Sequence, residues 1–216
     1  MPENLDEAEI RVLGSLVEKQ LTTPEYYPLT LNALTAACNQ KSNRDPVVVY
    51  DEAIILGAID SLRERNLVYL HYGSTSRTVK YKHMLPSVYD LDPAGTAVMG
   101  VLMLRGPQML GEIRERSGRL FEFGSIAEVS EKLDELTRRD QPLVVKLERQ
   151  PGQKDPRYAH LLAGPVAASA IVNKNEIIRD AASGSKIAEL EQDVGELKND
   201  LAEFRREFSE FRRQFD

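Results

Sequence analysis

The sequence has few of the residues that most chemical sites need. Its 216 residues include no tryptophan, three histidines and one cysteine, Cys38. A single cysteine excludes an internal disulfide and is typical of a reducing compartment, so we expect a cytoplasmic protein. The histidines and the cysteine show no metal-ligand spacing. We therefore expect no bound metal and no cofactor.

Long hydrophobic runs and an excess of positive charge are also missing. The run AIILGAI, residues 53–59, is far shorter than the roughly 20 residues that span a bilayer, and the N-terminal stretch MPENLDEAEI has no apolar signal region. We expect neither a secretory signal nor a membrane segment. The net charge is −6, divided as −3, 0 and −3 over residues 1–91, 92–164 and 165–216. No part is a basic domain, which argues against a general polyanion binder.

Catalytic motifs are missing as well. The chain has no GxxxxGK[ST] phosphate loop, no GxGxxG after a strand, and no nucleophile beside a base in a known motif. The stretch SGSK, residues 183–186, fits the Ser-x-x-Lys pattern of acyl-enzymes, but no partner motif accompanies it and Ser185 is better placed as a helix cap. We expect that the protein is not an enzyme and has no catalytic residues.

What the sequence does contain is an internal repeat. Four pairs of segments correspond: 5–20 with 91–106, 28–40 with 107–119, 52–70 with 126–147, and 80–86 with 157–163. Each copy reads helix, helix, helix, strand, turn, strand, which is the order of a winged helix, a variant of the helix-turn-helix. His83 and His160 occupy the same place in the two copies, so we expect a structural role for both.

The repeat predicts a mainly α fold with small β-hairpins, an α+β architecture of two tandem winged-helix domains plus a C-terminal coiled-coil-like helix. The expected domains are residues 1–90 and 91–163, followed by a linker at 164–185 and a heptad-repeat helix at 186–216. The apolar residues expected to be buried on the third helices have helical spacing: Ile55, Ile59 and Leu62 in the first copy, and Val129, Leu133 and Leu136 in the second.

The last 30 residues carry a heptad pattern, with apolar residues alternately three and four positions apart. The residues expected to form its seam include Leu190, Val194, Leu197, Leu201, Phe204, Phe208 and Phe211. In a parallel pair of helices the g and e positions that face each other have opposite charges, whereas an antiparallel pair would bring mostly like charges together. We expect a homodimer through a parallel coiled coil. A trimer, or docking of this helix onto the rest of the chain, is the alternative.

The third helices offer a poor surface for DNA. In the second copy Glu128, Glu131 and Glu135 would face phosphate, and in the first copy Ile54 and Leu56 add apolar surface. The basic residues that could contact nucleic acid or another partner lie elsewhere: Lys41, Arg44, Arg77, Lys80, Lys82, Arg114, Arg116, Arg119, Arg149, Lys154 and Arg157. A solvated polar face is the alternative meaning of these charges.

The stretch CNQKSNRDP, residues 38–46, is longer than its counterpart in the second copy. The repeat spacing is 79 residues at the second helices and 74 at the third, so the first copy has five extra residues here. Two interpretations stay open. The stretch is a preorganised polar loop that presents Lys41, Ser42, Asn43 and Arg44 to an anionic or polar partner, or it is a self-bonded loop that joins two helices.

Three separated stretches resemble the YceH family of bacterial proteins: CNQKSNRDPV from Cys38, RTVKYKH from Arg77, and PLVVKLERQPGQKDPRYAHLL from Pro142. The resemblance covers roughly residues 5–163. It implies a tandem winged-helix fold and no catalytic residues, and it leaves out the heptad-repeat helix. Two functions remain: a DNA-associated regulator that self-associates through its C-terminal helix, and a protein–protein interaction scaffold that uses winged helices as docking modules without binding DNA.

Overall fold

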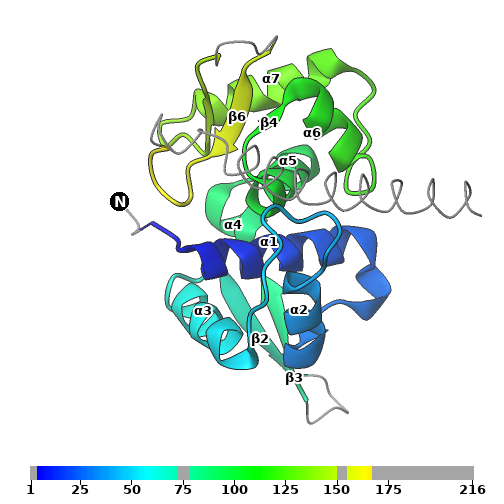
Figure 1. Cartoon of the computed structure of the whole chain (residues 1–216), viewed down its shortest axis with the longest axis vertical. Helices are drawn as coiled ribbons and strands as arrows, with labels where there is room; N and C mark the ends of the chain where they lie inside the picture. Colours follow the sequence, from blue (N-terminus) through cyan, green and yellow to red (C-terminus); the bar gives the residue numbers. More distant parts are fainter. Residues whose placement is uncertain (1–3, 73–77, 150–154, 167–216) are drawn as a thin grey trace, which may run out of the picture. The chain divides into compact units, whose positions relative to one another are not determined.

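The two halves of the chain repeat one order of helices and strands (Figure 1). The computed structural model describes residues 4–72, 78–149 and 155–166, and we call residues 4–90 the first half and residues 91–166 the second half. The first half contains α1 (Glu7–Thr22), the short 3-10 helix η1 (Pro24–Tyr26), β1 (Leu29–Thr30), α2 (Leu31–Cys38), α3 (Glu52–Glu64), β2 (Val68–Tyr72), β3 (Val79–His83) and α4 (Leu85–Tyr89). The second half contains α5 (Pro93–Arg105), β4 (Gln108–Met109), α6 (Leu110–Ser117), α7 (Ile126–Thr137), β5 (Val144–Lys146) and β6 (Arg157–His160).

An aspartate caps the first helix of each half. The Asp6 carboxylate accepts the backbone N–H of Glu9 at 2.7 Å, and the Glu9 carboxylate accepts the Asp6 N–H at the same distance. These two bonds satisfy N–H groups that the start of α1 would otherwise leave unpaired. Asp92 caps α5 by accepting the Gly95 N–H at 2.7 Å, with a proline in the first helical turn.

Each half also contains a three-stranded antiparallel sheet, with strand order β1-β3-β2 in the first and β4-β6-β5 in the second. Equivalent residues pair in the two sheets: Leu29 with Tyr81 and Val68 with His83 in the first, Gln108 with Tyr158 and Val144 with His160 in the second. The predicted mainly helical α+β chain with small antiparallel hairpins is confirmed. Sequence reasoning missed β1 and β4, because strands of two residues show no alternation. The predicted heptad-repeat helix lies outside the described residues.

The third helices bury the residues that their spacing predicts. On α3 the apolar face is Ile55, Ile59 and Leu62, and on α7 it is Val129, Leu133 and Leu136; none is more than 1% exposed. The outward positions are as expected too, since Ile54, Leu56 and the three glutamates of α7 are exposed. Cys38 is fully buried at the end of α2, where it packs as a small apolar residue.

The two strand histidines serve the packing of their sheets. The His83 N–H donates to the Tyr27 hydroxyl at 2.7 Å, and His83 Nδ1 accepts the Leu85 N–H at 3.3 Å. Burial lowers the pKa of both His83 and His160 to about 4. Both imidazoles are therefore neutral at pH 7, which fits a structural role in equivalent strands.

Helices α1 and α5 pack against each other and join the two halves. A methyl group on Gly100 would lie 2.9 Å from Val17 Cγ1, and one on Gly14 would lie 3.1 Å from Met103 Cβ. Residues 14 and 17 correspond to residues 100 and 103 in the repeat, so the contact is reciprocal, as across a two-fold axis. Glycine at both positions lets the helices approach closely.

This contact merges the two halves into a single core. Buried residues of both halves form one hydrophobic cluster, and both halves belong to one compact unit that ends at Val166. The boundary predicted after residue 90 lies between α4 and α5, and the residues on its two sides share one core, so the division into two domains stays a prediction. Of the linker predicted at residues 164–185, the part from residue 167 onward lies outside the described residues.

The α1–α5 contact predicts opposite effects for two glycine substitutions. Gly57 lies inside α3 with open space around its Cα, so Gly57→Ala should raise the free energy of unfolding by about 0.5–1 kcal/mol through helix propensity. Gly100→Ala should lower it by about 1 kcal/mol or more, because the new methyl group displaces the stiff Val17 side chain. Urea unfolding of both variants measures this. A stabilised Gly100→Ala variant would show that the helices do not meet as described.

Candidate functional site

The polar stretch after α2 folds back onto the rest of the first half and onto α5. Asn39 holds one end, since its side chain accepts the Tyr50 N–H at 2.8 Å and donates to the Tyr50 carbonyl at 2.7 Å. The Asp45 N–H donates to the Leu104 carbonyl at 2.9 Å and ties the other end to α5. Both ends of the loop are therefore anchored by hydrogen bonds to distant parts of the chain.

Arg44 is buried beneath this loop and does not face a partner, which corrects the expectation that the loop presents it. Its residue is 6% exposed, and its guanidinium donates to both carboxylate oxygens of Glu18, at 3.1 and 2.7 Å, and to the Ala37 carbonyl at 2.8 Å. The reason is that α1 buries Glu18, and a buried carboxylate needs a cation and hydrogen-bond donors. Lys41, Ser42 and Asn43 are exposed at the tip. The loop is thus held by hydrogen bonds on its buried side and exposes these three residues on its solvent side.

Asn43 connects the tip of the loop to the second half. It adopts a left-handed backbone conformation, with φ of 60°, which is uncommon for a residue other than glycine. Its side-chain oxygen accepts a short hydrogen bond from Arg105, in the last turn of α5. Sequence reasoning missed Arg105. The repeat could have indicated it, because residue 105 corresponds to residue 19, and both are basic residues near the end of the first helix.

A cleft of about 430 Å³ opens where this loop, α1, α5 and α6 meet. Its charged and polar lining includes Lys19, Ser42, Asn43, Arg105, Arg116 and Arg119, and we call it the cationic cleft. Equivalent positions of the repeat line it together, Lys19 with Arg105 and Gln40 with Arg119. The structure therefore brings together four predicted residues that are far apart in the sequence, two from the loop and two from the end of α6.

Positive charge is in excess in the cationic cleft. Glu18 is neutralised by Arg44, and Arg116 is paired with Glu112 at 3.1 Å. Arg119 has no hydrogen bond or ion pair with any other residue in the part of the chain that the structure describes. The pKa of Arg105 is lowered, first by burial and then by the neighbouring positive charge of Arg116. A small anion in the cleft would relieve this repulsion and find several donors.

The remaining predicted basic residues do not line the cleft. On β3, Lys80 is half-buried and Lys82 exposed, and Arg149 is exposed after β5. Arg114 donates to the Gly124 carbonyl at 3.2 Å, and Arg157 donates to the Pro107 carbonyl at 3.0 Å, so both also stabilise local backbone. Arg77 and Lys154 lie outside the described residues. Within the described ranges, no three metal-ligating side chains gather and no helix is long and apolar enough to cross a bilayer.

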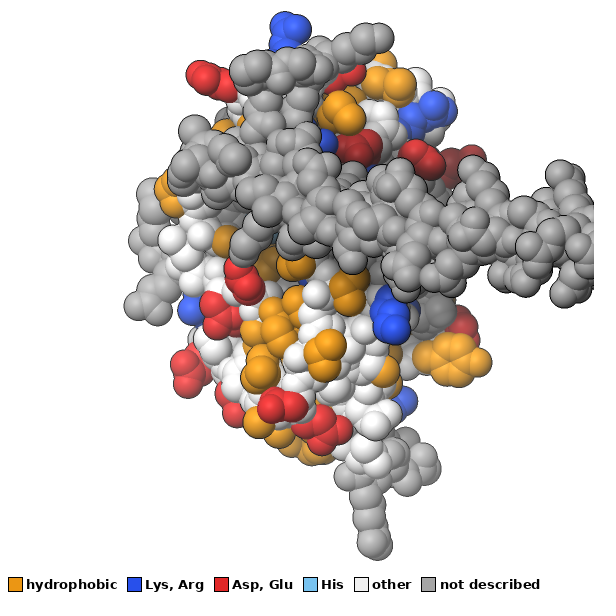
Figure 2. All heavy atoms as spheres, in the orientation of Figure 1, with side chains coloured by type: hydrophobic (Ala, Val, Ile, Leu, Met, Phe, Trp, Pro, Cys, Tyr) orange, Lys and Arg blue, Asp and Glu red, His pale blue; other side chains and the backbone are white. Residues whose placement is uncertain are grey.

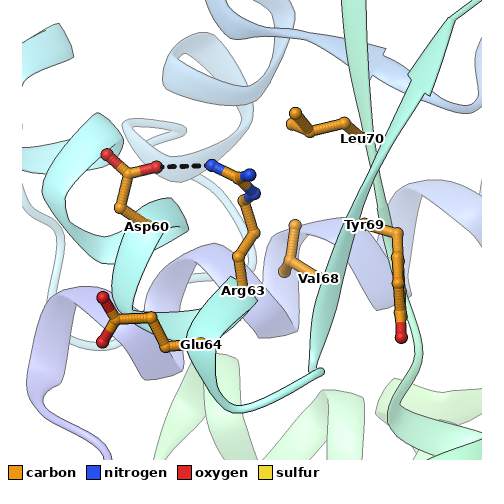
Figure 3. Close-up of a pocket in the computed structure, with 6 residues that line it drawn as sticks. All are labelled: Asp60, Arg63, Glu64, Val68, Tyr69 and Leu70. Carbon is orange, nitrogen blue, oxygen red and sulfur yellow. Dashed lines mark hydrogen bonds and ion pairs between the residues drawn. The ribbon is translucent and has the colours of Figure 1, made fainter.

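A second concave surface, of about 610 Å³, lies between α3 and β2. Figure 3 shows Arg63 of α3 reaching to Asp60 on the same helix, and the two form an ion pair at 2.9 Å. Glu64 adds a further negative charge, and Val68, Tyr69 and Leu70 of β2 form the opposite wall. Its one arginine is already paired, so this groove is a poor site for phosphate.

The third notable surface is the segment before α3, residues 47–49, which we call the valine segment. Val47 is 52% exposed and Val49 91% exposed, and nearby Ile54 on α3 is 43% exposed. Among the described residues, no hydrogen bond involves the backbone of the three valines. Figure 2 shows hydrophobic side chains gathered on this face of the first half, with acidic side chains around them. Such a surface suits a protein partner better than solvent.

Because Arg44 is buried and paired with Glu18, we predict that it contributes to the stability of the fold and does not contact a ligand. Arg44→Met should lower the free energy of unfolding by about 3 kcal/mol, because it leaves the Glu18 carboxylate buried without its cation. Lys41→Met, three residues earlier and exposed, should change it by less than about 0.5 kcal/mol. Chemical denaturation compares them. Equal stability of the two variants would mean that Arg44 is not buried in solution.

The sequence is similar to those of several bacterial proteins. The chain is 48% identical over 194 residues to a UPF0502 protein of Citrifermentans bemidjiense, with 90% of each chain covered. It is 49% identical over 196 residues to a UPF0502 protein of Geotalea daltonii, covering 89% of each, and 42% identical over 201 residues to one of Shewanella piezotolerans, covering 88% of this chain and 93% of the relative.

The match to a family covers most of the described structure. Residues 5–153 match the family described as "Protein of unknown function, DUF480", a range that ends before β6 and includes every residue that lines the cationic cleft. The expected membership in a family of bacterial proteins is confirmed, while the name YceH stays a prediction. The chain belongs to the DUF480 family of UPF0502 proteins.

Proposed function

We propose that this protein is a non-enzymatic tandem winged-helix scaffold of the cytoplasm, whose first half docks an extended segment of a protein partner along the valine segment. The winged-helix assignment is supported by the repeated order of three helices and a three-stranded sheet, and by the equivalent strand pairing in the two halves. Winged helices occur with many functions, so the docking role depends on the surfaces and not on the fold.

The observation that carries this proposal is the valine segment itself. Burying an exposed valine side chain stabilises a complex by about 1.5–3 kcal/mol, and two of the three valines are at least half exposed. Their backbone N–H and C=O groups have no partner among the described residues. A partner strand laid along residues 47–49 would pair these groups and cover the side chains, which is recognition by β-strand addition.

The charges near the valine segment indicate the chemistry of its partner. Asp51 and Glu52, at the start of α3, are exposed directly after it. Asp60 and Glu64 are exposed further along the same helix, and Arg63 is paired with Asp60. A partner segment with apolar side chains flanked by lysine or arginine therefore fits this face best.

DNA binding is the second candidate function. Two lysines of β3 favour it, the exposed Lys82 and the half-buried Lys80. The third helices oppose it. On α7 the exposed glutamates 128, 131 and 135 would face phosphate, and the nearby Lys132 is already paired with Asp92 at 2.8 Å. An acidic helix in the major groove would repel the backbone that must hold it there.

Self-association completes the proposal. The heptad seam from Leu190 to Phe211 would hold two copies in a parallel coiled coil, with oppositely charged residues facing each other at the flanks. A dimer would present two valine segments. Two weak docking sites on one assembly bind a partner with two matching segments more tightly than either site alone.

The docking proposal predicts which valines matter. The full chain is used to isolate partners from the cytoplasm of a UPF0502-containing bacterium, and the retained protein is then purified and titrated. Val47→Asp/Val49→Asp should weaken its binding at least about tenfold, because each carboxylate would be desolvated on docking. Val88→Asp, at an exposed valine on α4, is the matched control. Equal affinity for wild type and the double variant would reject the valine segment as the docking surface.

A DNA titration of the same preparations separates the two candidates. With random-sequence duplex, the scaffold proposal expects no binding at low salt and no difference between wild type and a Lys80→Gln/Lys82→Gln variant. Duplex binding that weakens steeply with salt and is lost in the lysine variant would favour the regulator, because phosphate contacts release counterions.

The self-association proposal predicts a difference in mass. Analytical ultracentrifugation of the full chain should give a dimer, and a chain truncated after Gly184 should sediment as a monomer. A full-length chain with Leu197→Asp and Leu201→Asp should also be monomeric, since charged groups at seam positions would be buried without partners. If the truncated chain and the full chain have the same number of subunits, the coiled coil is not the dimer contact.

A further inference from the structure

We propose that the cationic cleft is a binding site for a small phosphate-bearing molecule, held between the two halves of the chain. The site is independent of the valine segment, so this inference goes beyond the proposed function. It gives the polar loop after α2 a role that neither docking nor dimerisation explains.

The first reason is the charge left without a counterion. Four basic side chains line the cleft, namely Lys19, Arg105, Arg116 and Arg119. One neighbouring carboxylate, that of Glu18, is held by the buried Arg44 at 2.7 Å, and Arg116 is matched by Glu112 at 3.1 Å. Glu115 is the remaining acidic residue of the lining. Lys19 also lies 3.7 Å from a Glu18 carboxylate oxygen. Arg105 and Arg119 are therefore the basic residues of the lining without an ion-pair partner among the described residues, and they outnumber the one remaining carboxylate, so an anion would restore the balance.

The second reason is the kind of donor that the cleft presents. Arginine guanidinium groups form two parallel hydrogen bonds to phosphate, and three of the four basic residues are arginines. Ser42 and Asn43 add a hydroxyl and an amide at the rim. The cleft combines charge with neutral donors, and a phosphate group brings more charge and more acceptor oxygens to them than a plain carboxylate or a halide does.

The third reason is that the site is held in place before any ligand arrives. Arg44 fixes the loop from beneath by its bonds to Glu18 and Ala37, and the Asp45 N–H fixes it to α5. Asn43 keeps its left-handed backbone conformation and contacts Arg105 directly. Groups that are already ordered lose little conformational freedom on binding, so more of the contact energy remains as affinity.

Size and symmetry indicate a compact ligand with two charged groups. A volume of about 430 Å³ lies within the range of small-molecule clefts, and a duplex is much larger than this. Lys19 enters from the first half, and Arg105 and Arg119 enter from the second. A net charge of −6 on the whole chain also repels an extended polyanion, while a small anion meets mainly the local potential of the cleft.

Isothermal titration of the full chain with inorganic pyrophosphate tests the site. We expect saturable binding by the wild type, and at least about tenfold weaker binding by Arg119→Gln, because a charge-assisted contact is lost. Arg119 is exposed and makes no contact that the fold needs among the described residues, so this variant should unfold at the wild-type urea concentration. Arg149→Gln, an equal change of charge at another exposed arginine, is the matched control and should bind as wild type does.

Two further titrations identify the chemistry. Orthophosphate should bind more weakly than pyrophosphate, because it reaches one side of the cleft, and citrate should bind more weakly still if the arginine geometry selects phosphate. Pyrophosphate should also raise the melting temperature of the wild type but not of Arg119→Gln, since a ligand that contacts both halves stabilises the folded chain. No binding at millimolar pyrophosphate, equal binding by Arg119→Gln, or citrate binding as tight as pyrophosphate binding would each overturn the proposal.

Discussion

The close approach of α1 and α5 is the contact on which the other features of this structure depend. Gly14 and Gly100, at equivalent positions of the repeat, leave room for the side chains of the opposite helix, so the two helices meet reciprocally. Interiors are close-packed, and a single methyl group at either site would have to displace a neighbour. Because α1 and α5 each lie in the core of their own half, their contact joins both cores into one. It also places the ends of the two helices, with Lys19 and Arg105, at one cleft.

The buried Arg44–Glu18 pair holds one wall of that cleft in place. A lone buried carboxylate on α1 would be costly, and Arg44 removes this cost while it holds the loop that carries Ser42 and Asn43. The five extra residues of the first copy therefore do two things. They bring Arg44 to the buried carboxylate, and they place Ser42 and Asn43 on the surface. The two interpretations of the loop are parts of one arrangement, in which a self-bonded base supports an exposed tip.

The two halves share an architecture but present different surfaces. The first half exposes valines with unpaired backbone before α3, whereas the second half exposes glutamates along α7. Neither third helix offers the basic face that a groove of DNA requires. The repeated architecture is therefore the same in both halves, while the exposed positions differ between an apolar segment and an acidic helix face. The shared surface is the cleft between the halves, where equivalent positions of the repeat meet.

Local patterns in the sequence determined the capped starts of α1 and α5 and the buried faces of α3 and α7, because each depends on neighbours within a few residues. The equivalence of His83 and His160 followed from the internal repeat. The sequence also indicated that residues 38–46 and the basic end of α6 belong to a polar surface. Only the tertiary structure decided that Arg44 points inward, that two-residue strands complete both sheets, and that Asn43 meets Arg105, 62 residues away. Each of these outcomes depends on a hydrogen bond or ion pair between residues that are far apart in the sequence. The spacing of apolar residues along the chain does not predict such partners.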